Sequence, residues 1–383
     1  MRSGSSASRL SVRAGTIFAL ALLAPFAHAA GAPRHASPTP KLGKTARIET
    51  THVAEAPAVH AGQGSLTGKT TLDPELQAAM VKLLDETRAP GGAIVVSNVR
   101  TGRILAWASR GPGDWVRDAN TSSASVFKIV TTTALLDRHK ASLATRQCYT
   151  DTEHGITEHD LEDGPRDIGC VPLSEALGLS INAVFARLTL KHLTPAELRQ
   201  TAATIGFGSK VPADVDAPFG DVTIPDDRLG LARSSAGFWN AKLSPLGALF
   251  AMQTIANGGE RVKLFVHDDG TTQPTRVSLG RAISTETAHA MTQMLEVTTK
   301  RGTAAKAFHD PQGRPFLPNV RVAGKTGTLV GGHPSRMVSW FTGFAPADKP
   351  EIAVAVLLSN DVTWWSKGNV VARKVFEQYF AKK

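Results

Sequence analysis

An α+β fold is predicted from where β-rich and helical patterns fall along the 383 residues. β-rich runs at 93–99 and 104–109 surround a Gly-containing turn, which is typical of a hairpin. Three further runs, at 320–323, 338–344 and 352–358, lie near the C-terminus, whereas residues 120–300 show mostly helical spacing broken by loops. We therefore expect an antiparallel β-sheet flanked by helices, with strands from both ends of the domain, plus a mostly helical subdomain.

The outer helices of this domain have recognisable ends. Asp73 and Pro74 have the residue types of a helix cap and first turn, and apolar residues recur at helical spacing up to Leu84. The stretch 345–350 contains two prolines and is expected to form a turn between two strands. A final amphipathic helix is expected over about 370–381.

The first 71 residues lack the pattern of a folded domain. Three arginines precede an apolar run over 14–27, and Ala27-His28-Ala29 gives a small-x-small end, so we expect a secretory signal peptide over residues 1–29. The alternative is an uncleaved anchor, although the run is short for a span of about 20 residues. Residues 30–71 are rich in Ala, Pro, Gly, Thr and Ser and are expected to form a flexible tether. We therefore predict export to the periplasm or cell envelope.

The net charge of +10 comes largely from this N-terminal segment. Residues 1–71 hold eight of the 43 Lys and Arg residues and two of the 33 Asp and Glu residues, which leaves 35 against 31 in the rest of the chain. No basic run with interleaved aromatic residues occurs in that remainder. We therefore expect no nucleic-acid partner.

The chain has two cysteines, Cys148 and Cys170. An exported protein meets an oxidising compartment, so the even count favours a disulfide between them. In the chain-entropy view, a loop of this length adds roughly 3 kcal/mol of stability. The alternative is a pair of buried free thiols.

Ser125-Val126-Phe127-Lys128 is the first of three short segments that together suggest acyl-transfer chemistry. The polar residues 120–123 can cap a helix and place Ser125 in its first turn, where unpaired N–H groups and the helix dipole favour negative charge. Lys128 lies one turn along on the same face. Burial and a second nearby cation would lower the pKa of Lys128, so that its neutral amine could take the proton of the serine. Alone, such a pair also occurs by chance.

Ser180-Ile181-Asn182 is the second segment. It follows a predicted short helix that is capped by Ser174 and ends near Gly178, and a second apolar helix begins after Asn182. The Ser180 hydroxyl could pass a proton to a leaving group, and the Asn182 amide could hold a substrate amide. Taken alone, the segment fits a polar turn between two helices better than it fits a site.

Lys325-Thr326-Gly327-Thr328 is the third segment, and it continues the run 320–324. Strand alternation puts Thr326 and Thr328 on one face, where they could grip a carboxylate, with Lys325 on the other unless the strand twists. Gly327 would leave space for substrate, and the N–H of Thr328 could form an oxyanion hole with that of Ser125. Lys325 would supply a positive charge that attracts the carboxylate. The same charge would lower the pKa of Lys128 in the first segment.

The three segments occur once each, in this order, 55 and 145 residues apart. In these residues the chain resembles the transpeptidase domain of the penicillin-binding proteins. Similar family landmarks are Arg100–Ala106, Ser244-Pro245-Leu246, 255–259, 302–304 and 340–346. The resemblance covers roughly residues 75–383, and we take residues 72–383 as the transpeptidase domain.

The resemblance implies a β-lactamase/transpeptidase-like fold and a serine D,D-transpeptidase or D,D-carboxypeptidase. Ser125 would be acylated by the D-Ala-D-Ala end of a peptidoglycan stem peptide, and β-lactam antibiotics would acylate the same residue. The other implied roles are general base for Lys128, proton shuttle for Ser180, substrate contact for Asn182, and carboxylate and oxyanion site for Lys325, Thr326, Gly327 and Thr328. The resemblance implies no cofactor and no metal, and it leaves room for partners in cell-wall synthesis.

Two departures from the family pattern concern substrate preference rather than the reacting groups. Ala124 precedes the serine where relatives often have Gly, and Ala236-Gly237-Phe238-Trp239-Asn240 stands where many have Gly-x-Gly. Two alternative functions remain. A β-lactamase needs a base for deacylation, and the class A segment Glu-x-x-Leu-Asn is not found. A sensor that is acylated by β-lactams without turnover would need a transmembrane relay or a partner domain.

Two other clusters of residues have simpler explanations. His154, Glu158, His159 and Asp160 lie between the cysteines without the spacing of a tetrahedral site, so we expect no metal there. The tryptophans at 239, 340, 364 and 365 are expected in the core or in the lining of a groove.

Overall fold

The structure, a computed structural model, describes residues 59–61, 66, 68–151, 155–238, 240–268, 270, 276–331, 335–361 and 366–381. The predicted signal peptide, most of the tether, His154, Trp239, Trp364 and Trp365 lie outside these residues. In chain order the elements are β1 Val59–Ala61, α1 Pro74–Glu86, β2 Gly91–Asn98, β3 Ile104–Arg110, η2 Ala124–Phe127, α2 Lys128–Asp137, β4 Arg146–Tyr149, η3 Glu158–Asp160, β5 Gly169–Pro172, α3 Leu173–Leu179, α4 Asn182–His192, α5 Pro195–Ile205, α6 Arg228–Ala236, α7 Pro245–Ala256, β6 Glu260–Val262, β7 Ser278–Arg281, α8 Thr285–Lys300, α9 Ala305–Phe308, β8 Ala323–Gly331, β9 Arg336–Ala345, β10 Ile352–Asn360 and α10 Gly368–Phe380.

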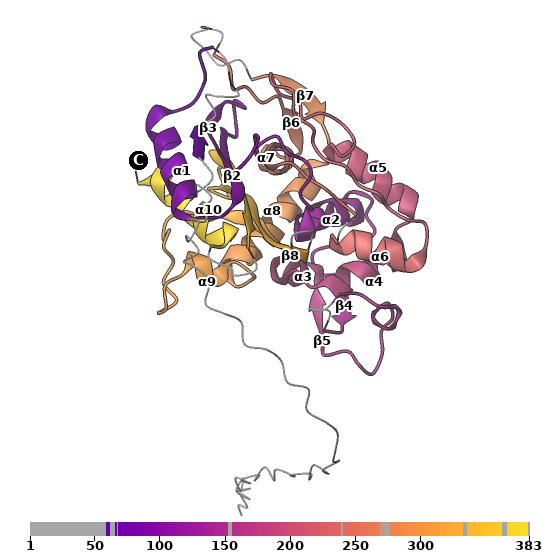
Figure 1. Ribbon diagram of the computed structural model, residues 1–383. Helices are drawn as coiled ribbons and strands as arrows, with labels where there is room; N and C mark the ends of the chain where they lie inside the picture. Colours follow the sequence, from indigo (N-terminus) through magenta and orange to yellow (C-terminus); the bar gives the residue numbers. More distant parts are fainter. Residues whose placement is uncertain are drawn as a thin grey trace, which may run out of the picture. The chain divides into compact units, whose positions relative to one another are not determined.

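The central sheet is antiparallel and has the strand order β1-β3-β2-β10-β9-β8 (Figure 1). β2 and β3 form the predicted hairpin, and β10 joins that hairpin to β9 and β8 from the other end of the chain. The predicted α+β fold is therefore confirmed. β8 is an edge strand, so one of its sides faces away from the sheet, and it contacts the short turn η2.

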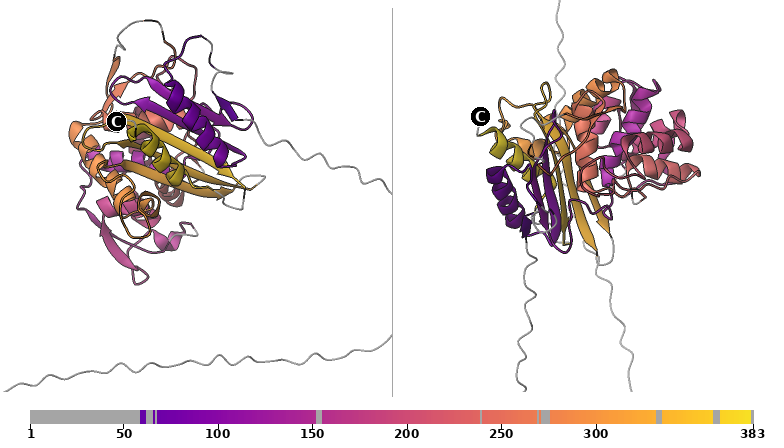
Figure 2. Two further views of the ribbon diagram at one scale, coloured as in Figure 1. Left: turned by 90° about the vertical axis from the view of Figure 1, so that its left-hand side faces the viewer. Right: turned by 90° about the horizontal axis from the view of Figure 1, so that it is seen from above.

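Both faces of the sheet are buried, against different helices (Figure 2). The even-numbered residues 352–358 of β10 pack into a core with α1 and α10, whereas the odd-numbered residues 353–357 pack into a larger core with α2, α7 and α8. This alternation follows from the two-residue period of a strand. It explains why β10 is almost wholly apolar, since a strand covered on both faces has no polar side.

The two helices on the smaller core match their predicted positions. The Asp73 carboxylate accepts a hydrogen bond from the N–H of Leu76 at 2.8 Å, and Pro74 opens α1. α10 covers most of the predicted 370–381 helix and begins two residues earlier. Among the described helices, none combines the length and hydropathy of a membrane span.

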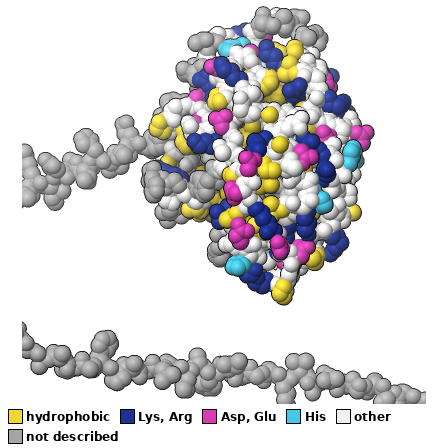
Figure 3. Space-filling view, turned by 90° about the vertical axis from the view of Figure 1, so that its right-hand side faces the viewer, with side chains coloured by type: hydrophobic (Ala, Val, Ile, Leu, Met, Phe, Trp, Pro, Cys, Tyr) yellow, Lys and Arg dark blue, Asp and Glu magenta, His cyan; other side chains and the backbone are white. Residues whose placement is uncertain are grey.

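The surface over the helical region carries charges of both signs. Figure 3 shows Lys and Arg side chains interspersed with Asp and Glu on this face. The pattern agrees with the nearly balanced charge of residues 72–383. It differs from the one-signed patch that binds nucleic acid.

The predicted strand at 320–323 is wrong in its position, because β8 begins only at Ala323. Ala323 pairs with Phe344 and β9 ends one residue later, so the residues before Ala323 have no neighbouring strand. The Val322 carbonyl instead accepts a hydrogen bond from the Thr299 hydroxyl of α8 at 2.6 Å. The strand therefore runs through the third motif and on to Gly331.

The start predicted for α3 is also wrong, whereas the end predicted near Gly178 lies within one residue of the observed end. Its N-cap is Pro172, and Ser174 lies within the helix. Gly178 does not end the helix but packs tightly against α8, since an added Cβ there would overlap the Val297 side chain. The helix ends one residue later, where Ser180 adopts the left-handed conformation with φ +60°.

Candidate active site

Ser125 lies in η2, a single 3₁₀ turn that leads directly into α2. The predicted cap by residues 120–123 is wrong, because Ser123 makes no side-chain cap and α2 begins at Lys128. Ala124 has a φ of +46°, a left-handed conformation that costs an L-residue roughly 1–2 kcal/mol. This reversal of the backbone interrupts the helix before Ser125, and it explains why glycine suits the position before the serine.

The Lys128 side chain is fully buried, and its Nζ has three partners. It lies 2.7 Å from Ser125 Oγ, 2.7 Å from Asn182 Oδ1 and 2.6 Å from the Ala236 carbonyl oxygen. A neutral amine has two N–H groups and one lone pair, and the two carbonyl oxygens can only accept. When Lys128 is neutral, its lone pair is therefore left for the Ser125 hydroxyl. This is the geometry of a base that removes the serine proton.

The pKa values of both lysines of the site are depressed. Burial lowers the pKa of Lys128 well below its ordinary value, and the charge of Lys325 lowers it further, the two causes that the sequence predicts. Burial lowers the pKa of Lys325 to about 7. The hydrogen-bond partners of both ammonium groups are neutral hydroxyl, amide and carbonyl oxygens. Without an opposite charge, burial favours the neutral amine.

Ser180 is the C-cap of α3, as a turn residue should be, whereas Asn182 is the first residue of α4 and not, as predicted, part of the turn. Ser180 Oγ accepts a hydrogen bond from Lys325 Nζ at 2.9 Å, while the amide oxygen of Asn182 accepts from Lys128. A hydroxyl that accepts from a lysine keeps its own proton for another acceptor. The segment 180–182 thus connects the two buried lysines and presents a hydroxyl that can donate.

β8 supplies the opposite wall. Thr326 and Thr328 share one face of the strand and line the cavity, whereas the Lys325 side chain is buried and reaches Ser180 and the carbonyl of Thr326, each at 2.9 Å. A Cβ added to Gly327 would lie 3.2 Å from Ser123 O and from Val126 Cγ2. The glycine therefore lets β8 lie close to η2, a packing role that the sequence did not indicate.

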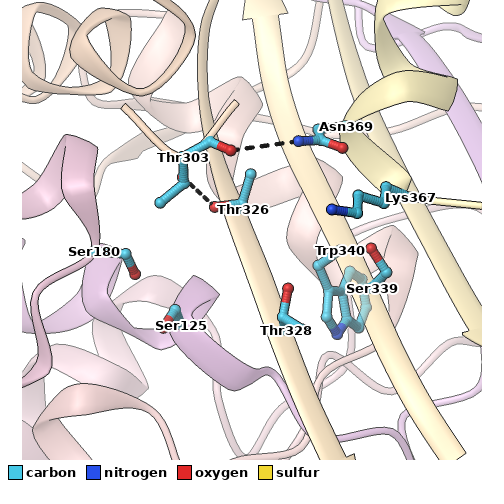
Figure 4. Close-up of a pocket in the computed structure, with 9 residues that line it drawn as sticks. All are labelled: Ser125, Ser180, Thr303, Thr326, Thr328, Ser339, Trp340, Lys367 and Asn369. Atoms are coloured by element: carbon cyan, nitrogen blue, oxygen red, sulfur yellow. Dashed lines mark hydrogen bonds between the residues drawn. The ribbon is translucent and has the colours of Figure 1, made fainter. Parts of the chain in front are cut away.

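These residues surround a cavity of about 220 Å³ (Figure 4). Its described lining is Ser125, Ser180, Thr303, Thr326, Thr328, Ser339, Trp340, Lys367 and Asn369. Five of these nine are missing from the predicted site: Thr303, Ser339, Trp340, Lys367 and Asn369. Thr303 and Trp340 lie in segments that resemble family landmarks, so the sequence could have indicated that they belong to the site. Lys367 and Asn369 stand in no motif, and only the fold brings α10 to the site.

A second cavity, of about 810 Å³, shares Thr328 with the first. Phe238 and Asn240, from the segment that departs from the family pattern, line it together with Arg233, Leu329 and Val330. The departure in sequence is therefore located beside the site. This position supports the prediction that it affects substrate preference.

The two cysteines form a disulfide between β4 and β5. β5 runs directly into α3, whose end carries Ser180. In the polar cluster between the cysteines, Asp160 accepts hydrogen bonds from Thr157 and Thr150, and no group of three potential metal ligands occurs within the described residues. Trp340 is buried, donates to the Ser122 carbonyl at 2.8 Å and also lines the cavity.

Comparison with known families now identifies the fold. The family described as "Penicillin binding protein transpeptidase domain" matches residues 92–381. The chain belongs to this family. Similar curated proteins are stage V sporulation protein D of Bacillus subtilis (strain 168), 27% identical over 346 residues (80% of this chain, 52% of that protein), and the peptidoglycan D,D-transpeptidase PbpA of Mycolicibacterium smegmatis, 28% identical over 257 residues (62% and 49%). The chain spans about half the length of those relatives.

Solved structures show the same fold. Penicillin-binding protein A from M. tuberculosis, as an imipenem acyl-enzyme complex, has a TM-score of 0.67 and 24% identity over 81% of this chain and 79% of that one. The transpeptidase domain of penicillin-binding protein 3 from Burkholderia pseudomallei has a TM-score of 0.65 and 23% identity over 82% and 94%. The arrangement of sheet and helices described above is therefore that of a penicillin-binding protein transpeptidase domain.

Proposed function

We propose that this transpeptidase-family protein is an exported serine D,D-transpeptidase or D,D-carboxypeptidase. It acts on D-Ala-D-Ala stem peptides of peptidoglycan through an acyl-enzyme on Ser125, and β-lactams acylate the same residue. The contact between Ser125 Oγ and Lys128 Nζ, at 2.7 Å beside a cavity, carries the proposal. The acyl-enzyme complex of a structural neighbour with imipenem gives it further support.

Acylation begins with proton transfer from the Ser125 hydroxyl to the neutral amine of Lys128. Ser125 Oγ then forms a bond to the carbonyl carbon of the penultimate D-Ala, and the negative charge moves to the carbonyl oxygen. The backbone N–H groups of Ser125 and Thr328 are the proposed donors to that oxygen. Preorganised donors of this kind typically contribute about 10²- to 10³-fold in rate each.

Departure of the terminal D-Ala needs a proton on its nitrogen. Ser180 is the proposed donor, because its hydroxyl accepts from Lys325 and can give its own proton to the leaving amine. As the C–N bond breaks, the acyl group stays on Ser125 Oγ. Lys325 replaces the proton that Ser180 gave, and Lys128 keeps the proton that it took from Ser125. An amine then takes the acyl group in transpeptidation, or water takes it in carboxypeptidation.

The proposed organisation of the chain has three parts. Residues 1–29 are a signal peptide, residues 30–71 a flexible tether and residues 72–383 the transpeptidase domain. The basic, apolar and small-residue order of the first part supports export. The N-terminus of the protein recovered from the cell envelope should then begin after Ala29, and a protein that keeps residues 1–29 would contradict cleavage.

The activity is tested with a stem pentapeptide that ends in D-Ala-D-Ala. The mature protein should release D-Ala, and an added amine acceptor should appear in the product if transpeptidation dominates. Ser125→Ala should abolish both reactions while the near-UV circular dichroism stays that of the parent. Release of D-Ala by the Ser125→Ala variant at the parental rate would rule out the proposed nucleophile.

The same preparation distinguishes the two alternatives. Rapid hydrolysis of a chromogenic cephalosporin would identify a β-lactamase. Stable acylation by penicillin without any reaction of the peptide would identify a sensor. Slow cephalosporin hydrolysis together with D-Ala release supports the peptidase.

A further inference from the structure

The cavity needs a positive charge to hold the free carboxylate of a D-Ala-D-Ala peptide, and Lys325 is poorly placed to supply it. Its side chain is fully buried, and its ammonium is held by Ser180 Oγ and the Thr326 carbonyl. It is absent from the described lining of the cavity, as is Lys128. Burial lowers the pKa of Lys325 to about 7, which weakens its hold on a positive charge at neutral pH.

Lys367 is the one ionisable side chain in the described lining of the cavity. In Figure 4 its ammonium points toward Thr326 and Thr328, from the side opposite Ser125 and Ser180. Its side chain is exposed to solvent. A carboxylate between the two threonines would therefore have two hydroxyls on one side and an ammonium on the other.

The backbone around Lys367 is held in place by the sheet. Lys367 is the N-cap residue of α10, and the N–H of Gly368 donates to Ser339 Oγ of β9 at 2.9 Å. Gly368 has no room for a side chain, because a Cβ there would lie 2.9 Å from the Ser339 carbonyl oxygen. The helix start is thus fixed against the strand beside β8. The positive end of the helix dipole adds to the charge of Lys367.

The hydroxyl of Thr326, on β8, is also held in one orientation before any substrate binds. Thr326 Oγ1 shares a hydrogen bond with Thr303 Oγ1 at 2.5 Å. This contact holds the Thr326 hydroxyl toward Thr303, which also lines the cavity (Figure 4). The described lining of the cavity therefore combines neutral threonine hydroxyls with one cationic side chain, that of Lys367.

We propose that Lys367 binds the C-terminal carboxylate of the stem peptide, and the equivalent carboxylate of β-lactams, together with the hydroxyls of Thr326 and Thr328. This assignment rests on the proposed function and makes it more specific. Lys325 then has two other roles: it donates a hydrogen bond to Ser180, and its charge lowers the pKa of Lys128. The substrate class that follows is a peptide or β-lactam with a free carboxylate, in preference to its ester or amide.

The test compares benzylpenicillin with its methyl ester, which lacks the negative charge. Second-order acylation rates are measured for the parent, Lys367→Gln, Lys367→Arg and Lys374→Gln. Lys374 is the matched control: it lies on the same helix, outside the cavity lining, in a half-exposed 3.9 Å contact with Glu86. Thermal denaturation of each variant confirms folding.

We expect the acylation rate of Lys367→Gln with benzylpenicillin to be about 10- to 100-fold lower than that of the parent, because a charge-assisted hydrogen bond is lost. With the methyl ester, the rate of the variant should equal that of the parent. Lys367→Arg should stay within about threefold of the parent, because it keeps the charge. Lys374→Gln should behave as the parent with both compounds. Added salt should slow acylation by the acid in the parent more than in Lys367→Gln.

Two results would overturn the assignment. The first is that Lys367→Gln reacts with benzylpenicillin at the parental rate. The second is that its acylation rates with benzylpenicillin and with the methyl ester fall by the same factor, which would indicate a structural role. A parent that reacts with neither compound would refute the proposed function itself, and the assignment of Lys367 with it. A parent that reacts with both while Lys367→Gln loses nothing refutes Lys367 alone.

Discussion

At the scale of single residues, the site depends on two lysines buried without a carboxylate partner among the described residues. Lys128 is bound to Ser125, Asn182 and Ala236, and Lys325 to Ser180 and Thr326. Burying an ammonium in this way costs stability and lowers its pKa. The lowered pKa serves catalysis, because only a neutral amine can remove the serine proton.

Lys128→Ala should slow acylation of Ser125 by about 10²- to 10⁴-fold, the usual contribution of a general base. The rate of labelling by a fluorescent penicillin measures this. Lys140→Ala is the control, since it makes the same change at an exposed lysine just beyond α2. An unchanged labelling rate in Lys128→Ala, with the native near-UV spectrum, would refute the role of this residue.

Lys325 gives stability a specific pH dependence. Its pKa is about 7 in the folded protein and about 10.4 in the unfolded chain. Between these values the unfolded chain binds more protons, so the free energy of unfolding rises with pH, by up to about 1.4 kcal/mol per pH unit for one group. Lys325→Met should remove this slope and be stabilising at pH 7.

Urea unfolding of the parent and Lys325→Met at pH 7, 8 and 9 measures the effect. The stability advantage of the variant should be largest at pH 7 and should shrink as the pH rises toward the pKa of the unfolded chain. A constant difference across this range would show that Lys325 does not titrate there. Lys374→Met makes the same change at a half-exposed lysine and serves as the control.

At the scale of elements, the nucleophile turn is shaped by two backbone conformations. Ala124 is left-handed, and Gly237, at the C-cap of α6 with φ +82°, packs against the Ala124 carbonyl. An added Cβ on Gly237 would overlap that carbonyl oxygen. The end of α6 therefore holds the turn that presents Ser125, and its last residue, Ala236, binds Lys128.

Gly237→Ala should lower the free energy of unfolding by about 3 kcal/mol or more and slow acylation, because it adds a clash to the cost of a left-handed residue. Gly208→Ala is a close control: its φ is +78° and nothing lies within 4 Å of an added Cβ. The control should cost only about 1–2 kcal/mol and leave acylation unchanged. Equal losses in the two variants would contradict the role given to Gly237.

The elements also show what the sequence could and could not predict. Periodicity and the cap at Asp73 located α1 and the strands β2, β3, β9 and β10, since these features are local. Gly178 was misread because a glycine that ends a helix and one that lets two helices touch look the same in sequence. The start of β8 depends on where β9 ends, and Lys367 reaches the cavity only through the packing of α10, so neither could be found from local pattern.

At the scale of the whole domain, residues 125, 180 and 325 meet because an edge strand and a helical region lie side by side. The three motifs were recognised from their order, yet their contacts required β10 to bring the two ends of the sheet together. The Cys148–Cys170 disulfide closes the hairpin that leads into α3 and Ser180. It thereby restrains the part of the helical region that carries the second motif.

Replacing both cysteines by alanine should lower the free energy of unfolding by about 3 kcal/mol, as expected for opening a loop of 22 residues. Thermal denaturation with and without a reductant measures the loss. The reductant should destabilise the parent and leave the double variant unchanged. If the parent and the double variant melt together in the absence of reductant, the disulfide contributes nothing.

The central claim is that one hydroxyl, activated by a buried amine, is the residue that accepts the acyl group. Mass spectrometry of the mature protein with and without benzylpenicillin tests it most directly. We predict one covalent adduct per chain, located by peptide mapping on Ser125 and absent from Ser125→Ala. An adduct on any other residue, or undiminished labelling of Ser125→Ala, would contradict the account.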